Sequence, residues 1–499
     1  MKLADLLISS AGCTVFGSAD KDVKDLIYHS DKAVSGSVFF AIEGQLTDGR
    51  EYIEKAVEKG ASAVVASGRL PQEIYEKVTV IETRDVRKTM AQMSAEFYGR
   101  PSERLLTIGV TGTKGKTSTT FMIRQILEAA GIKTGIIGTV YNGYDEHMKE
   151  ASATTPQSTE IQKNLAEMEA AGCKAVVMEV SSQGLMHSRV DCIDFDIGVF
   201  TNISPDHIGE GEHASFEEYL MWKSMLFKKC RRAVVNCDDQ RYEDIIKDAN
   251  LEQVVCFGQS DRADFRSMGQ KLWSERGVLG IKYELFAKKP CGDDTQREIT
   301  VNIPGRFNVQ NTLAAIAVCK SLGIPWSVIE ETMRDIKIPG RVETVDIGRD
   351  FTVLLDYAHN GIALKSLMDS LREYDPERLM LMFGCGGNRS KLRRYEMGEV
   401  SGRMADLTII TSDNPRFEEP QAIIDDIKTG IAKTNGKYVE ICDRKEAIAY
   451  AIHHGEPGDI IVLAGKGHED YQEIKGKKYP MDERVLIAEI LKEDQEKDQ

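Results

Sequence analysis

A glycine-rich stretch with two lysines is the part of the chain whose residue types and spacing most directly suggest chemistry. It runs Thr111-Gly112-Thr113-Lys114-Gly115-Lys116-Thr117-Ser118, after the apolar segment "LLTIGV" and before "TSTTFMIRQILEAAG". Glycines allow a tight turn that directs backbone N–H groups at an anion, and the positive end of the following helix adds to the attraction. The lysine before the threonine suits outer phosphates, and the threonine hydroxyl suits Mg²⁺. A solubilising surface turn is the alternative, but a strand before the stretch and a helix after it favour a phosphate loop that binds ATP.

The loop is shorter than the generic phosphate-loop pattern. Val110 stands where that pattern has its first glycine, so only Gly-Thr-Lys-Gly-Lys-Thr remains.

Lys223 is a second candidate because of the side chains around it. Ser215 and Glu218 predict a capping box that opens a helix over "EEYLMWKSMLFKK". At helical spacing the neighbours of Lys223 are all hydrophobic or aromatic: Tyr219, Leu220, Leu226 and Phe227. A lysine in such a stripe is costly unless it is neutralised or paired, and extension of its side chain to the surface is the alternative.

Three polar segments near the C-terminus each follow a run of β-formers. They are "GCGGNR" after "LMLMFG", "DNPR" after "DLTIIT", and "GKGHE" after "DIIVLA". Open α/β sheets gather ligand contacts at this end of their strands, so the segments are expected to meet. Together they contain Arg389 and Arg416, which suit carboxylates, and Asp413 and Glu469, which suit ammonium groups. Taken alone, Asp-Asn-Pro-Arg is ordinary turn chemistry, and "GCGGNR" lacks dinucleotide-site spacing.

The elements that must position these residues are alternating strands and helices. A chain of 499 residues is too long for one ordinary core. Strand and helix patterns alternate throughout, which predicts an α/β protein with largely parallel sheets. Proline at Pro101 and the segment Ile338-Pro339-Gly340-Arg341 suggest the boundaries. We therefore expect three domains, over residues 1–101, 102–337 and 338–499.

Composition narrows the class of protein. Basic residues number 64 and acidic residues 79, a net charge of −15, which argues against general binding to nucleic acid or to anionic membranes. No apolar run is long enough for a membrane span, and the N-terminal segment does not fit a signal peptide. Ten scattered cysteines without metal-site spacing indicate a reducing compartment, so the cytoplasm is expected.

The order of the motifs resembles that of a known family. After the short phosphate loop come "EVSS" at 179–182, "TN" at 201–202 with "DH" at 206–207, "GRFNVQN" at 305–311 and "DYAH" at 356–359. This pattern resembles the ATP-dependent Mur ligase superfamily, which includes folylpolyglutamate synthetases, and is most similar to its UDP-N-acetylmuramoyl-tripeptide synthetases. The resemblance implies a small N-terminal α/β domain for the uridine end of the substrate. It also implies a central parallel-sheet ATPase domain with the phosphate loop and a C-terminal Rossmann-like α/β domain for the amino acid.

The resemblance also implies an activity. Such enzymes are ADP-forming acid–amino-acid ligases that activate a carboxylate as an acyl phosphate, which an amine then attacks. Here the implied reaction adds meso-2,6-diaminopimelate to the D-Glu of UDP-N-acetylmuramoyl-L-Ala-D-Glu. That places the chain in peptidoglycan synthesis, and so in cell wall biogenesis, cell shape and cell division. Both substrates are small molecules; a monomer without membrane insertion or nucleic-acid partner is expected.

The family's catalytic and ATP-site residues carry over by position. The resemblance implies catalytic roles for Lys116, Glu179, His207 and Lys223, the last as N-carboxylysine. It implies Mg²⁺ ligands at Thr117, Glu179, His207 and the Lys223 carbamate, which would serve a second Mg²⁺. The implied ATP contacts are Gly112, Thr113, Lys114, Gly115, Lys116, Thr117, Ser118, Asn308, Asn311, Arg341 and Asp356.

The two other substrates have implied contacts as well. Those for the UDP-sugar peptide are Ser30, Thr154, Thr155, Ser181 and Arg189, and those for the amino acid are Arg389, Asp413, Asn414, Arg416, Gly465 and Glu469. The chain departs from the family at His29, Asp31, Gln183, His187 and Asn388. In the family, Asp-Asn-Pro-Arg accompanies enzymes that add diaminopimelate, whose distal carboxylate would bind Arg416, whereas enzymes that add L-lysine generally lack that arginine.

Three alternatives remain open. The same reaction could use L-lysine or another amino acid, or the chain could be a related superfamily ligase of the folylpolyglutamate type. A non-catalytic ATP-binding regulator on the same fold is the third, but it would need neither the lysine in the apolar stripe nor the paired arginines.

Overall fold

Short runs of β-branched residues near the N-terminus form a small sheet in the computed structural model, which describes residues 1–10, 12–44, 47–206, 208–209, 211–275, 277–289 and 293–497. The strand order is β1-β5-β4-β3-β2, and β1 alone among these pairs antiparallel to its neighbour. The strands are β1 (Thr14–Phe16), β2 (Asp25–Ile27), β3 (Ser37–Phe40), β4 (Ala63–Ser67) and β5 (Thr79–Thr83). The helices are α1 (Leu3–Leu6), α2 (Ile53–Glu58), α3 (Gln72–Lys77) and α4 (Val86–Phe97).

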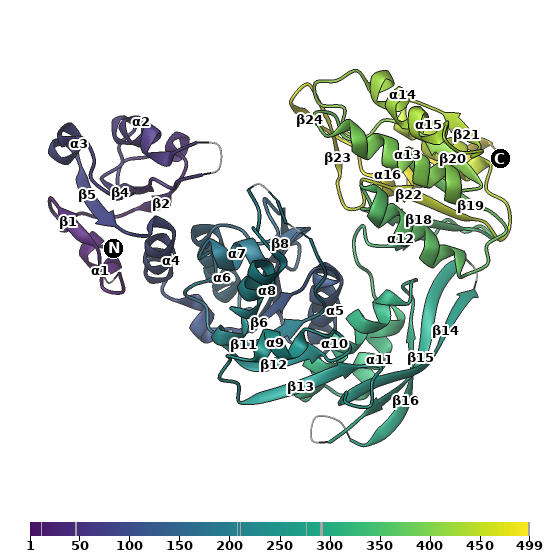
Figure 1. The fold of residues 1–499 in the computed structure, drawn as a ribbon, viewed down its shortest axis with the longest axis horizontal. Coiled ribbons are helices and arrows are strands. Elements are labelled where there is room, and N and C mark those ends of the chain that lie inside the picture. The colour runs from purple at the N-terminus through teal and green to yellow at the C-terminus, as the bar shows by residue number, and fades with distance from the viewer. Residues whose placement is uncertain are drawn as a thin grey trace. The chain divides into compact units, whose positions relative to one another are not determined.

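A second sheet follows, and it holds the phosphate loop (Figure 1). Its order is β13-β12-β11-β6-β10-β7-β8-β9, parallel from β13 to β7 and antiparallel at β8 and β9. The strands are β6 (Leu106–Thr111), β7 (Thr134–Ile137), β8 (Tyr141–Tyr144), β9 (His147–Glu150), β10 (Ala175–Glu179), β11 (Phe195–Phe200), β12 (Cys230–Asn236) and β13 (Gln253–Gly258). The helices are α5 (Lys116–Ala129), α6 (Ser158–Ala170), α7 (Ser182–Met186), α8 (Phe216–Ser224) and α9 (Tyr242–Ile246).

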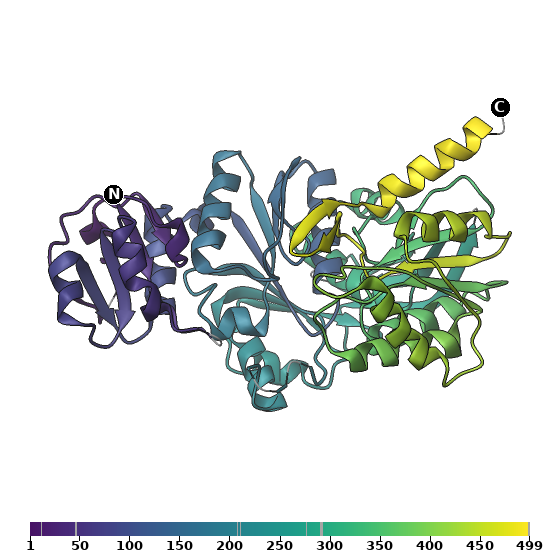
Figure 2. The ribbon, with the colours of Figure 1, turned by 90° about the horizontal axis from the view of Figure 1, so that it is seen from above.

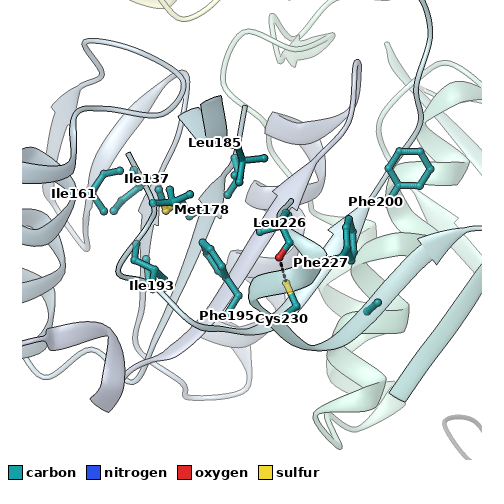
Figure 3. Packing of buried hydrophobic residues seen from close by; sticks show 14 of the residues in the cluster. Ile137, Ile161, Met178, Leu185, Ile193, Phe195, Phe200, Leu226, Phe227 and Cys230 are labelled. Atoms are coloured by element: carbon teal, nitrogen blue, oxygen red, sulfur yellow. Dashed lines mark hydrogen bonds between the residues drawn. The ribbon is translucent and has the colours of Figure 1, made fainter. Parts of the chain in front are cut away.

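The core of this sheet explains why its strands are apolar on both faces. Met178, Phe195 and Phe200 pack with Leu226 and Phe227 in one buried cluster (Figure 3). The thiol of Cys230 donates to the carbonyl oxygen of Leu226 at 3.1 Å, which satisfies a buried cysteine. Helices on both faces leave the carboxyl ends of the strands as the accessible edge, where the phosphate loop lies.

The C-terminal half contains a long antiparallel hairpin series and a third, mostly parallel sheet. The series consists of β14 (Phe265–Glu275), β15 (Val278–Ala287) and β16 (Thr295–Val301), followed by α10 (Phe307–Ser321) and α11 (Trp326–Arg334). The sheet has the order β17-β18-β22-β19-β20-β21, with β17 antiparallel. Its strands are β17 (Glu343–Val345), β18 (Thr352–Asp356), β19 (Leu379–Phe383), β20 (Leu407–Ile410), β21 (Tyr438–Glu440) and β22 (Ile460–Ala464).

The third sheet is covered by helices on both faces. Leu381, Phe383 and Val462 pack with residues of α12, α13 and α14, while Met380 and Met382 pack with residues of α15 and α16. The helices are α12 (Gly361–Arg372), α13 (Lys391–Met404), α14 (Pro420–Ile431), α15 (Arg444–His453) and α16 (Glu483–Lys497). A hairpin of β23 (Tyr471–Ile474) and β24 (Lys477–Pro480) precedes α16, which ends near the C-terminus (Figure 2).

The predicted α/β class with largely parallel sheets is confirmed. The structure forms two compact units, Met1–Asp264 with Ala314–Ile324 and Phe265–Leu313 with Pro325–Gln499. The three-domain division at residues 101 and 337 stays a prediction. Within the described ranges no helix combines the length and the apolar character needed to cross a membrane.

The helix expected to hold Lys223 is shorter than predicted. α8 ends at Ser224, and a separate 3₁₀ turn covers Phe227–Lys229. Ser215 accepts the Glu218 N–H as a capping box requires, but the Glu218 carboxylate accepts the N–H of Ala214 in place of that of Ser215.

Candidate active site

The phosphate loop joins the end of β6 to the first turn of α5. Its backbone is tied to the next strand end: Thr113 N–H donates to Asn202 O at 2.9 Å, and Lys114 N–H to Asn202 Oδ1 at 3.0 Å. Gly112 has φ 152°, and a Cβ there would lie 2.0 Å from Thr201 Oγ1, so the loop can pass this close only with glycine. The Lys116 ammonium donates to the carbonyl oxygens of Gly112 and Thr113 at 2.8 and 3.1 Å. The predicted loop residues therefore form one turn at the N-terminus of a helix, as an anion site requires.

Glu179 ends β10 beside the loop. The register pairs it with Val110, so its carboxylate reaches the first turn of α5. Thr117 Oγ1 donates to Glu179 Oε2 at 3.1 Å, and Thr139 donates to both carboxylate oxygens, at 2.8 Å from its N–H and 3.0 Å from its hydroxyl. A Cβ at Gly138 would lie 2.5 Å from Glu179 Oε1, so any larger residue here would displace the carboxylate. A hydroxyl and a carboxylate next to a phosphate loop are a donor set that fits Mg²⁺, which takes one or two carboxylates and completes its shell with water and phosphate.

Lys223 lies under the same loop. Its side chain is 1% exposed, and its ammonium donates to Gly112 O at 2.9 Å and lies 4.5 Å from the centre of the Tyr219 ring. Burial, with a smaller contribution from the Lys116 charge, lowers the pKa of Lys223 well below its usual value. Of the two alternatives for Lys223, burial in the apolar stripe is observed, and extension to the surface is excluded. The charge of Asp206 acts on the pKa of Lys223 in the opposite direction, but less strongly. His207 lies outside the described residues.

The residues predicted to bind the sugar peptide gather next to Glu179. Thr155 Oγ1 donates to Glu179 O at 2.9 Å and accepts the Ser181 N–H at 3.0 Å, and Thr154 and Thr139 share a hydroxyl contact of 3.1 Å. Arg189 donates to Thr155 O at 2.7 Å. Ser30 is buried at the start of a 3₁₀ turn and makes none of these contacts, and the departing residue Asp31 forms surface ion pairs with Lys55 of α2 and with Lys59 at the end of that helix.

Arg87, which the sequence patterns do not single out, belongs to this region. Its Nη1 is buried without a hydrogen-bond partner, as is Arg189 Nε. Burial first, and then the charges of Arg87 and Arg189, lower the pKa of His187 to about 4, so this departing residue is neutral at pH 7. Two half-buried arginines, each with one buried donor that has no partner, suit an anionic ligand. The signal available in the sequence is Asp85, which caps α4 and so places Arg87 in its first turn.

The other predicted ATP contacts belong to the second unit. Asn308 and Asn311 are buried on the first turns of α10 and bond to each other, with Asn311 Nδ2 donating to Asn308 Oδ1 at 2.9 Å. Asp356 accepts two N–H groups, from Val342 and Ala358, and burial raises its pKa although Arg341 lies nearby. The Arg341 guanidinium lies 5.1 Å from the Tyr357 ring centre. Their role in ATP binding stays a prediction.

The predicted amino-acid contacts line a single cavity of about 320 Å³ at the carboxyl edge of the third sheet. All six are present: Arg389, Asp413, Asn414, Arg416, Gly465 and Glu469. Tyr357, His359 and Arg393 also line the cavity and were not predicted. Asn388, which departs from the family, has φ 53° and accepts the Phe417 N–H at 3.2 Å. Three arginines and two carboxylates in one cavity suit a zwitterion that carries an additional negative group.

Comparisons with known proteins agree with this arrangement. The Mur ligase middle domain matches residues 110–319, the glutamate ligase domain of Mur ligases matches 340–467, and the Mur ligase catalytic domain matches 23–98. The chain is 42% identical to the UDP-N-acetylmuramoyl-L-alanyl-D-glutamate–2,6-diaminopimelate ligase of Caldanaerobacter subterraneus subsp. tengcongensis, over 99% of both chains. It is 39% identical to ligase 1 of the same name from Clostridium acetobutylicum, over 99% of this chain and 100% of that one.

A solved structure of a diaminopimelate ligase of that name is 28% identical and covers 95% of both chains with a TM-score of 0.67. The chain belongs to the Mur ligase family.

Proposed function

We propose that this chain is the ATP-dependent, ADP-forming ligase that joins meso-2,6-diaminopimelate to the D-Glu of UDP-N-acetylmuramoyl-L-Ala-D-Glu in peptidoglycan synthesis. The observation that carries the choice of amino acid is the charge of the cavity, where Arg389, Arg393 and Arg416 face Asp413 and Glu469. Diaminopimelate has two carboxylates and two ammonium groups, whereas lysine has two ammonium groups and only one carboxylate. Two relatives that match 99% of the chain are named as ligases of this dipeptide and 2,6-diaminopimelate.

The chemistry follows from the groups at the phosphate loop. The γ-phosphoryl group of ATP passes to the substrate carboxylate and ADP leaves; the amine of diaminopimelate then attacks the acyl carbon, and phosphate leaves as the amide forms. Lys116 and the loop N–H groups hold the phosphates, and Glu179 with Thr117 provides oxygen ligands for Mg²⁺, which offsets charge between the two anionic reactants. Thr154, Thr155, Ser181 and Arg189 hold the sugar peptide.

Lys223 is proposed to react with CO₂. Its lowered pKa supplies a neutral amine, whose lone pair forms a bond to the carbon of CO₂ while one proton is released, so that the neutral amine becomes a carbamate anion. The carbamate would serve a second Mg²⁺, with His207. Asn308, Asn311, Arg341 and Asp356 are proposed to complete the ATP site. A cytoplasmic monomer with three domains is part of the same proposal.

The test measures phosphate release with the UDP-sugar dipeptide, ATP and Mg²⁺, while only the amino acid is varied. We expect diaminopimelate to support turnover at least tenfold above L-lysine. Equal turnover with lysine would contradict the specificity, and no turnover with any amino acid would contradict the ligase assignment for this acceptor. Folate with glutamate serves as the acceptor control for the folylpolyglutamate alternative.

A further inference from the structure

The hairpin β23–β24 packs against the loop that carries Arg416. Arg416 N–H donates to Glu473 O at 2.9 Å, and Lys475 N–H donates to Arg416 O at 2.6 Å. Arg416 has φ 52°, a left-handed conformation that disfavours residues with a Cβ. The two backbone bonds to the hairpin hold this conformation, so the hairpin fixes where the arginine side chain starts.

The Arg416 side chain is fixed as well. Its Nε donates to Glu473 Oε2 at 2.9 Å and its Nη1 to Gly387 O at 2.8 Å. A guanidinium has five N–H groups, so these two bonds leave three without a partner among the described residues. Arg416 lines the amino-acid cavity, whereas Glu473 does not. The carboxylate of Glu473 therefore restrains the guanidinium from outside the cavity and leaves its other N–H groups to a ligand.

Glu473 is itself anchored through a buried cation. Its N–H donates to Asn414 Oδ1 at 2.8 Å, and the same oxygen accepts the Lys466 ammonium at 2.9 Å. Lys466 is fully buried and also donates to Glu469 Oε2 at 2.9 Å. Asn414 and Glu469 line the cavity, so one ammonium links two cavity residues to the strand that carries Glu473.

We propose that Glu473 is a positioning residue for amino-acid selection: it holds the Arg416 guanidinium in the orientation that receives the distal carboxylate, before the ligand enters. The inference rests on the proposed function. It differs from two simpler accounts. Glu473 could bind the ligand's ammonium group directly, or the pair could be a surface ion pair with little effect, as most such pairs are.

The test compares the Michaelis constants of purified full-length variants. Glu473→Ala removes the restraint on the Arg416 side chain. The ligand must then order that side chain on binding, so the KM for diaminopimelate should rise about tenfold. The KM for ATP and kcat should stay within about twofold, because the Glu473 carboxylate acts on Arg416, which is assigned to the amino acid and not to ATP. Glu473→Gln retains an oxygen acceptor for Nε and should keep the KM within about threefold of the parent. The matched control is Glu399→Ala, which removes a 2.8 Å ion pair to Arg403 within α13 and should leave every constant unchanged.

A double-variant cycle separates positioning from direct contact. In an Arg416→Ala background, Glu473→Ala should change the KM for diaminopimelate by less than about twofold, because the guanidinium that Glu473 positions is absent. Additive effects would overturn the proposal, as would equal losses in the Gln and Ala variants or an unchanged KM in Glu473→Ala. If the alanine variant does not fold, Glu473→Asp replaces it. Asp keeps the charge but is one methylene shorter, so its KM should rise at least about threefold, and a parent-like KM would count against positioning.

The parent assay distinguishes failure of this inference from failure of the proposed function. If the parent does not use diaminopimelate, the proposed function fails, and crystal structures of the parent and of Glu473→Ala decide the inference. In the variant the guanidinium should no longer donate to Gly387 O. An unchanged guanidinium position would overturn the proposal.

Discussion

Lys223→Met tests whether the lysine is kept for chemistry at the expense of stability. The ammonium is 1% exposed, and its bond to Gly112 O is not essential to that oxygen, which also accepts from Lys116 at 2.8 Å. Methionine has a similar length and no charge to bury. Unfolding free energy should therefore be unchanged or higher in the variant. Turnover should fall about 10²–10³-fold, the usual cost of removing one group that stabilises developing charge.

The pH dependence of the free energy of unfolding gives the sign and the size of the Lys223 contribution. Burial lowers the pKa of Lys223 in the folded chain well below its usual value of 10.5. At a pH between the folded and the unfolded pKa, the unfolded chain therefore binds more protons than the folded chain. The parent's stability should then rise with pH in this window, by at most about 1.4 kcal/mol per pH unit, and Lys223→Met should lack this contribution. The stability advantage of the variant should shrink by up to that amount between pH 8 and pH 9.

Urea unfolding in bicarbonate-free, Mg²⁺-free buffer measures the effect. Trp222 lies next to Lys223, and a background with Trp273→Phe and Trp326→Phe makes it the single tryptophan of the chain, because the sequence has 3. Parallel pH slopes in parent and variant would refute the buried, neutral lysine. Retained turnover in Lys223→Met would refute its catalytic use, and Lys223→Ala should regain part of its activity with formate or acetate if a carbamate is the working form.

Three further outcomes follow from the same contacts. Glu179→Gln keeps an acceptor for Thr139 but loses charge, so the Mg²⁺ concentration for half-maximal turnover should rise at least about tenfold while the melting temperature changes little. Arg87→Met should raise the KM for the UDP-sugar dipeptide about tenfold with little loss of stability, since its buried Nη1 has no partner and its Nη2 gives up only one exposed bond, to Glu43 O at 3.1 Å; an unchanged KM would exclude Arg87 from the site. Arg444→Met strands the buried Glu483 carboxylate and should cost about 3–5 kcal/mol of unfolding free energy, measured by urea titration; a smaller loss would show that water reaches the carboxylate.

The strand ends explain how much of the site could be predicted from sequence. Arg389, Asp413 and Glu469 lie far apart in the chain, yet each follows a run of β-formers, and parallel strands bring such ends to one edge. Glu179 also ends a run of β-formers, and the parallel pairing of its strand with β6 brings it beside the phosphate loop. Apolar spacing around Lys223 indicated an apolar stripe but left extension to the surface open, and the structure decides for burial.

Contacts that depend on loop geometry could not be predicted. Local periodicity does not show that α8 stops at Ser224, because Leu226 and Phe227 fit the apolar stripe whether the helix continues or not. Nor does it show that Glu473 reaches Arg416, since that contact depends on a positive φ at Arg416 and on the hairpin register. Arg87 was missed for the same reason: its unpartnered donors exist only once the helices pack.

The arginines around the amino-acid cavity differ in how many of their donors the protein itself uses. Arg444 is 3% exposed, and its three nitrogens donate to Glu483 and to the carbonyl oxygens of Ser412 and Ala464. It therefore joins the ends of β20 and β22 and can offer little to a ligand. Arg416 uses two donors and keeps three, and its charge is paired with the Glu473 carboxylate, whose side chain is 26% exposed. The same residue type is therefore structural in one case, and in the other it keeps the free donors that the proposed selection of the ligand requires.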